Sequence, residues 1–140
     1  MGRPAGPKSR CGGVWTEARY TNFVKGLLRS GSGKWAPKQQ CIKKARVSRG
    51  IYTCSCCGEL VTATIKHPTT GKRTKNILAD HVIPIIDPAV GFTTWDDFIE
   101  GLFCEEENFQ AVCYACHKEK TKEERDIATA RKRREKLNGS

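Results

Sequence analysis

The chain has 140 residues, with 25 basic and 15 acidic side chains, a net charge of +10 and 38% hydrophobic residues. This length predicts one domain with a small core, and the positive charge favours a polyanionic partner such as nucleic acid. No stretch approaches the roughly 18 apolar residues of a membrane span, so we expect no membrane partner. The first seven residues lack an apolar core, so we expect no secretory signal.

The N-terminal third predicts an arm followed by two helices. Residues 1–14 are rich in glycine, proline and basic groups, which favours a flexible arm. Thr16 is a suitable helix N-cap. The apolar residues that follow, Tyr20, Phe23, Val24, Leu27 and Leu28, recur with the spacing of one buried helical face. A second short helix begins at Pro37. Residues 15–49 are therefore predicted to form an N-terminal helical region.

The middle of the chain predicts a metal knuckle followed by two strands. Cys54 and Cys57 flank a short turn, and Gly58 permits the sharp bend that aims two thiolates at one ion. Apolar and polar residues alternate over 61–66, as in a half-buried strand. A turn over 67–72 leads to a returning strand over 76–82, which carries Asp80 and His81 on opposite faces.

The C-terminal part predicts a loop and two further helices. Pro84 and Pro88 favour a loop, and Thr94 caps a helix with Asp96 and Asp97 in its first turn. The last helix is expected to begin near Cys113 and to run to about Lys136, with a strongly basic surface. We therefore predict a core over residues 50–125 and a solvated basic tail over 126–140.

Two Cys-x-x-Cys pairs predict a zinc site formed by Cys54, Cys57, Cys113 and Cys116. Four thiolates complete the tetrahedral coordination of Zn²⁺ and leave no open position, so this zinc is expected to be structural. Cys56 lies between the first two ligands, but the spacing of the downstream pair favours Cys54 with Cys57. A redox protein that uses its Cys-x-x-Cys thiols is the competing interpretation.

His117 directly follows the last of these cysteines. Adjacent side chains on a helix diverge by about 100°, so Cys116 can face the zinc while His117 faces a different centre. Asp80 and His81 diverge in the same way across a strand, so one can bind a metal ion while the other addresses a water molecule.

At these residues the chain resembles the HNH endonucleases, also called the ββα-metal or His-Me finger class. Asp80-His81, Asn108 and His117 match the three elements of the motif, with Asp80 in place of the first histidine. The paired cysteines and the sequence Cys116-His117-x-x-Lys120 match the zinc-knuckle subgroup. Residues 91–104 resemble an insert found in bacteriophage HNH proteins. The resemblance implies an α+β fold: a small ββα-metal core with a four-cysteine zinc site, flanked by N-terminal helices and a long basic C-terminal helix.

The resemblance also implies an activity, the metal-dependent hydrolysis of DNA by nicking or double-strand cleavage. His81 would be the general base, Asp80 and His117 would hold one Mg²⁺ or Mn²⁺, and Asn108 would orient His81. We expect basic side chains to hold DNA phosphates: Lys72, Arg73, Lys120, Lys122, Arg131 and Arg133. The products would carry 5′-phosphate and 3′-hydroxyl ends.

One alternative is a non-catalytic, zinc-stabilised nucleic-acid-binding protein that assists a phage DNA-packaging machine. Such a protein would bind nucleic acid without cleaving it, and it would not need Asp80, His81, Asn108 and His117 together. In either case we expect a monomer in the cytoplasm, that of the host bacterium if a phage encodes the chain.

Overall fold

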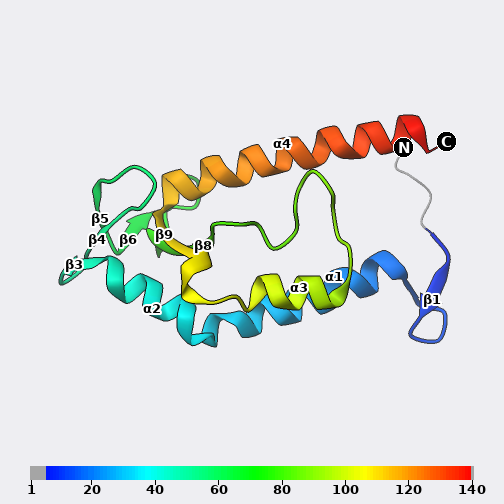
Figure 1. Cartoon of the computed structure of the whole chain (residues 1–140), viewed down its shortest axis with the longest axis horizontal. Coiled ribbons are helices and arrows are strands. Elements are labelled where there is room, and N and C mark those ends of the chain that lie inside the picture. Colours follow the sequence, from blue (N-terminus) through cyan, green and yellow to red (C-terminus); the bar gives the residue numbers. More distant parts are fainter. Residues whose placement is uncertain (1–5, 140) are drawn as a thin grey trace. The chain divides into compact units, whose positions relative to one another are not determined.

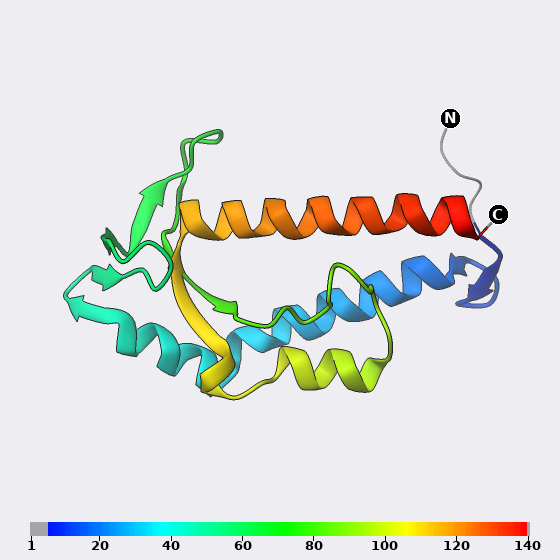
Figure 2. The same cartoon turned by 45° about the horizontal axis from the view of Figure 1, so that its top comes forward.

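The computed structural model describes residues 6–139 (Figures 1 and 2). Residues 1–5 of the predicted arm and residue 140 of the predicted tail lie outside this range. The chain separates into two compact units, and the first ends at Gly33 while the second begins at Lys34. The sequence-based boundaries at residues 14, 49 and 125 stay predictions.

The first unit is a two-stranded ribbon followed by a helix. β1 (Lys8–Arg10) pairs antiparallel with β2 (Trp15–Thr16), so part of the predicted arm is a strand. α1 (Glu17–Gly31) begins as predicted, because the Thr16 side chain accepts a hydrogen bond from the Arg19 N–H at 3.2 Å. Phe23 and Leu27, predicted to be buried, are 50% and 59% exposed.

A short 3₁₀ turn, η1 (Ser32–Lys34), precedes α2 (Ala36–Ala45). Pro37 lies in the first turn of α2, as predicted. The indole N–H of Trp35 donates to the Cys104 carbonyl at 2.7 Å, which fixes the start of α2 against the segment after α3. A three-stranded antiparallel sheet follows, with the order β3 (Arg46–Ser48), β4 (Ile51–Thr53) and β5 (Leu60–Thr62).

Two further antiparallel strand pairs complete the β structure. β6 (Thr64–Lys66) and β7 (Arg73–Lys75) form a hairpin, whereas β8 (Ile77–His81) pairs with β9 (Phe109–Cys113). The expected return of residues 76–82 along the strand at 61–66 is therefore wrong. Buried Asn76 redirects the chain, because its N–H donates to the Ala63 carbonyl while its side-chain oxygen accepts from the Tyr114 N–H at 3.2 Å.

The remaining elements are α3 (Trp95–Leu102), the 3₁₀ turn η2 (Glu106–Asn108) and α4 (Tyr114–Asn138). Thr94 caps α3 as predicted, accepting a hydrogen bond from the Asp97 N–H at 3.1 Å. α4 begins where the sequence indicated and continues through most of the predicted tail. The protein is thus a mixed α+β fold, as predicted, and α4 follows directly from the β8–β9 pair (Figure 1).

Candidate functional site

Four cysteine side chains converge where β4, β9 and α4 meet. Cys54 follows β4, Cys57 lies in the turn before β5, Cys113 ends β9 and Cys116 lies in the first turn of α4. Their sulfur atoms all lie within 4.8 Å of one another. Thiolates arranged tetrahedrally at about 2.3 Å from one ion would be separated by about 3.8 Å, so this spacing fits a metal. The four predicted ligands are brought together and can hold one metal ion.

Backbone groups hold the first two cysteines in place. Gly58 has a φ of +74°, a conformation that favours glycine, and its N–H donates to the Cys54 carbonyl at 2.9 Å. The Ser55 N–H donates to the Ala111 carbonyl at 2.8 Å. The turn is therefore closed on itself and attached to β9.

The pKa values of two of these thiols are shifted in opposite directions. Burial alone would raise the pKa of Cys54, but backbone N–H groups of Cys57 and Cys113 donate to its sulfur and lower that pKa to about 6. The Cys113 side chain raises the pKa of the Cys116 thiol. The backbone donors thus favour the thiolate form of Cys54, which is the form that binds a metal.

A second cluster surrounds Asp80, near the end of β8. Oδ2 of Asp80 accepts hydrogen bonds from Gln110 Nε2 at 3.2 Å and from Lys120 Nζ at 2.5 Å. Oδ1 lies 3.9 Å from Nε2 of His117. Gln110 is directly opposite Asp80 in the β8–β9 register, and His117 and Lys120 are three residues apart on α4. The structure therefore places the Asp80 carboxylate beside the His117 ring.

His81 is the next residue of β8, and its ring has different neighbours. Nε2 of His81 lies 3.1 Å from the Leu102 carbonyl oxygen, at the end of α3, and the ring packs on Phe109. Because a carbonyl only accepts, the Nε2–H donates, and the neutral ring keeps its free lone pair on Nδ1. Burial lowers the pKa of His81, the Leu102 carbonyl opposes this, and the positive charge of Lys38 lowers the pKa further.

Asn108 braces the chain just after His81. Its backbone carbonyl accepts from the Val82 N–H at 2.8 Å, and its side-chain Oδ1 accepts from the Ile83 N–H at 2.9 Å. Asn108 contacts neither the Asp80 carboxylate nor the His81 ring in any hydrogen bond that the structure shows within residues 6–139. Its effect on His81 therefore passes through the backbone.

The facing of Asp80 and His117 is compatible with a divalent ion. Neighbouring ligands of an octahedral ion at about 2.1 Å lie about 3.0 Å apart, so the two ligand atoms would have to approach each other by roughly 0.9 Å from their 3.9 Å separation to share one ion. Within residues 6–139, no third carboxylate, histidine or cysteine joins this pair in a group able to hold a metal. Further ligands would have to come from water or from a substrate.

Sequence reasoning missed three contributors to this region. Gln110 is recognisable only once residues 109–113 are seen as a strand paired with β8. Lys38 comes from α2, which contacts both β8 and β9, and nothing in its local sequence points to His81. Leu102 contacts His81 through its backbone carbonyl, a group that every residue type has, so the identity of residue 102 gives no indication of this contact.

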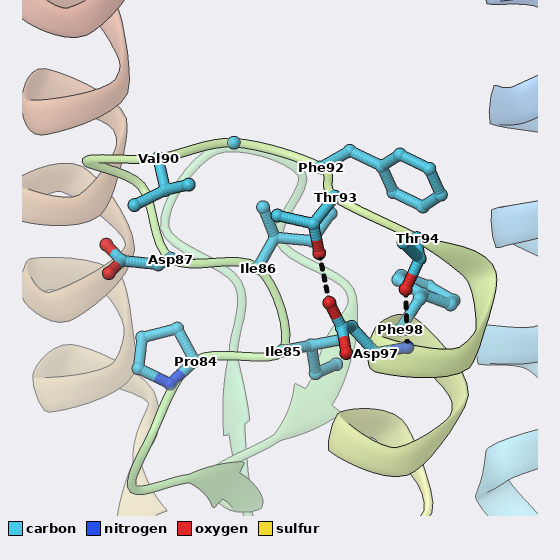
Figure 3. Close-up of a pocket in the computed structure, with 11 residues that line it drawn as sticks. Pro84, Ile85, Ile86, Asp87, Val90, Phe92, Thr93, Thr94, Asp97 and Phe98 are labelled. Carbon is cyan, nitrogen blue, oxygen red and sulfur yellow. Dashed lines mark hydrogen bonds between the residues drawn. The ribbon is translucent and has the colours of Figure 1, made fainter.

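A hollow of about 210 Å³ lies apart from these groups, between the loop after β8 and the start of α3 (Figure 3). Its lining is mainly apolar and includes Ile85, Ile86 and Phe98. The Asp97 carboxylate at its edge accepts a hydrogen bond from the Thr93 hydroxyl at 2.6 Å, as Figure 3 shows. None of the predicted catalytic residues lines this hollow, so we do not place the chemistry there.

The predicted phosphate-binding side chains occupy two regions. Lys72 and Arg73 are exposed on the β6–β7 hairpin, and Lys122 and Arg133 are exposed on α4. Arg131 is different, since its side chain is only 14% exposed and lies 3.6 Å from Glu135. Its guanidinium also packs at Gly91, where an added Cβ would come within 1.9 Å of it. Arg131 thus fastens the loop after β8 to α4 in this structure.

Comparison of the chain with protein-family models, with curated proteins and with solved structures finds no match. In the described part of the chain, no helix combines the length and the apolar character needed to cross a membrane. Functional interpretation therefore rests on the geometry of the two clusters.

Proposed function

We propose that the chain is a metal-dependent DNA endonuclease of the HNH class, in which β8, β9 and α4 form the ββα-metal core. The observation that carries this proposal is the facing of Asp80 and His117 next to a histidine, His81, whose Nε2 is held by a carbonyl. A pair of side chains that can bind a divalent ion, beside an oriented imidazole, suits the hydrolysis of a phosphodiester by metal-ion and general-base catalysis.

The four cysteines hold a structural zinc ion in this proposal. A site of four thiolates has no open position for a substrate, which suits a structural role. The ion fixes the start of α4 to β9 and to the turn after β4. It thereby sets the position of His117 relative to Asp80.

His81 acts as the general base. Its Nδ1 accepts a proton from a water molecule, while the Leu102 carbonyl keeps the ring oriented through Nε2. Asn108 holds the backbone after His81 and so fixes where the ring points. When bound to Asp80 and His117, Mg²⁺ or Mn²⁺ supplies electrostatic stabilisation of the charge that develops on the phosphate and on the leaving 3′ oxygen.

Exposed basic side chains on the β6–β7 hairpin and on α4 hold the DNA backbone. Such contacts position a duplex without reading its sequence. The net charge of +10 supports a polyanionic substrate.

The test is relaxation of a supercoiled plasmid by purified protein with Mg²⁺, with Mn²⁺ or with EDTA. We expect metal-dependent conversion to open-circle DNA, and linear product would add double-strand cleavage. Binding of the plasmid without cleavage in the presence of either metal would contradict the endonuclease and favour the non-catalytic DNA-binding protein.

The pH dependence of cleavage is a second expected result. His81 accepts a proton only when neutral, and its pKa is below the ordinary value of 6.5, so kcat/KM is expected to fall only as pH drops below about 6.5. Lys38→Met removes a positive charge that disfavours the protonated ring, so the pKa of His81 rises and the acid limb moves to higher pH.

The control for this shift is Lys43→Met, an exposed lysine on the same helix. Profiles of kcat/KM from pH 5 to 8.5 are compared for wild type and the two variants. An acid limb that stays in place in Lys38→Met, or moves to lower pH, would contradict the assignment of the limb to His81.

A further inference from the structure

Within the described residues 6–139, Asp80 supplies the one negative charge of the proposed ion site. Among residues 6–139, no second carboxylate joins Asp80 and His117 in a metal-holding group. Mg²⁺ in proteins is commonly held by one or two carboxylates together with substrate phosphates. A site with one carboxylate is therefore sensitive to anything that neutralises it.

That carboxylate already has a cationic partner. Lys120 Nζ lies 2.5 Å from Asp80 Oδ2, and the side chains of Asp80 and Lys120 are only 15% and 26% exposed. The same ammonium donates to the His81 backbone carbonyl. Gln110 also donates to Oδ2, so this oxygen is fully engaged and only Oδ1 faces His117.

Lys120 has a second acidic neighbour. Its Nζ lies 3.9 Å from a carboxylate oxygen of Glu124, one turn further along α4. The ammonium can therefore leave Asp80 without losing every counter-charge. An incoming phosphate would offer a stronger and more accessible partner than Glu124.

We propose that Lys120 is a resident counter-ion of Asp80 that keeps the divalent-ion site weak until a DNA phosphate draws the ammonium away. This inference rests on the proposed function and adds regulation to the same site. In the free protein, the ammonium of Lys120 neutralises the carboxylate of Asp80. A bound phosphate attracts Lys120 and also supplies oxygen ligands for the ion. Metal and DNA thus bind cooperatively, and by linkage each raises the affinity for the other by the same factor.

The test measures Mn²⁺ affinity by electron paramagnetic resonance of the free ion, with zinc-loaded full-length protein. Lys120→Met is expected to bind Mn²⁺ at least about tenfold more tightly than wild type without DNA, because a like charge a few ångströms away is removed. A non-cleavable phosphorothioate duplex is expected to raise the Mn²⁺ affinity of wild type more than that of Lys120→Met.

Two variants make the result decisive. Lys43→Met removes an exposed charge from α2 and is expected to leave Mn²⁺ affinity unchanged. His117→Ala removes a proposed ligand and is expected to weaken Mn²⁺ binding. Circular dichroism and zinc content confirm that each variant is folded.

The outcomes separate this inference from the proposed function. If His117→Ala loses Mn²⁺ while Lys120→Met binds it no more tightly than wild type, Lys120 only holds Asp80 in place. The inference about Lys120 is then overturned, and the proposed ion site stands. If His117→Ala binds Mn²⁺ as wild type does, or if no form binds it, the proposed ion site fails and the inference fails with it.

Discussion

His81→Ala is expected to lower the rate of DNA cleavage by about 10²- to 10⁴-fold, the usual contribution of a general base. The ring is hydrogen-bonded to the Leu102 carbonyl and packs on the Phe109 ring. Its removal leaves the Asp80–His117 pair and the cysteine cluster in place. Single-turnover cleavage of a labelled duplex at saturating enzyme and Mg²⁺ measures the rate without a contribution from DNA affinity.

His67→Ala is the matched control for this prediction. His67 lies in the β6–β7 turn, where its Nδ1 accepts from the backbone N–H groups of Thr69 and Thr70 at 3.1 and 3.2 Å. Among residues 6–139, the structure shows no hydrogen bond or ring contact between His67 and either Asp80 or His81, so cleavage should stay close to wild type. Added imidazole is expected to restore part of the activity of His81→Ala, which a purely structural role would not allow. Cleavage by His81→Ala at the wild-type rate would remove His81 as the base.

The local features of this fold were predictable because short-range chemistry specifies them. Thr16 and Thr94 cap helices because a hydroxyl that accepts a backbone N–H acts within three residues. Pro37 suits the first turn of a helix because the N–H it lacks has no partner there in any case. The spacing of the two cysteine pairs likewise indicated the cluster that the structure forms.

The pairing of strands could not be predicted in the same way. Residues 76–82 have a pattern that fits a hairpin return, and the choice of β9 as partner depends on Asn76 and Tyr114, which are 38 residues apart. Once β8 is paired with β9, Gln110 and Asp80 must be neighbours. The apolar face of α1 was predicted only in part. The spacing of its residues correctly indicated a helix, but it did not indicate whether other residues cover that face, and Phe23 and Leu27 are largely exposed.

Loss of the metal from the cysteine cluster is expected to have the largest effect on stability. Cys54 and Cys113 are 0% and 6% exposed and pack with Val112, so two of the four proposed zinc ligands are themselves part of the core. Cys54→Ser or Cys113→Ser should abolish zinc binding, and both variants should lose cooperative thermal unfolding of the second unit. A strong chelator should do the same to wild type, because the free energy of binding structural zinc is free energy of folding.

Cys56→Ser is the control that makes this prediction specific. Cys56 lies in the same turn but is exposed and outside the convergent group, so this variant should keep one zinc ion per chain. Zinc content by mass spectrometry and thermal unfolding by circular dichroism distinguish the cases. If Cys54→Ser kept zinc and Cys56→Ser lost it, Cys56 rather than Cys54 would be the zinc ligand. A wild-type protein that contains no zinc and whose thermal unfolding does not change with the chelator would contradict a structural metal ion at the four cysteines. β9 and the start of α4 would then be held by the pairing of β9 with β8, by the Asn76 hydrogen bonds and by packing around Val112.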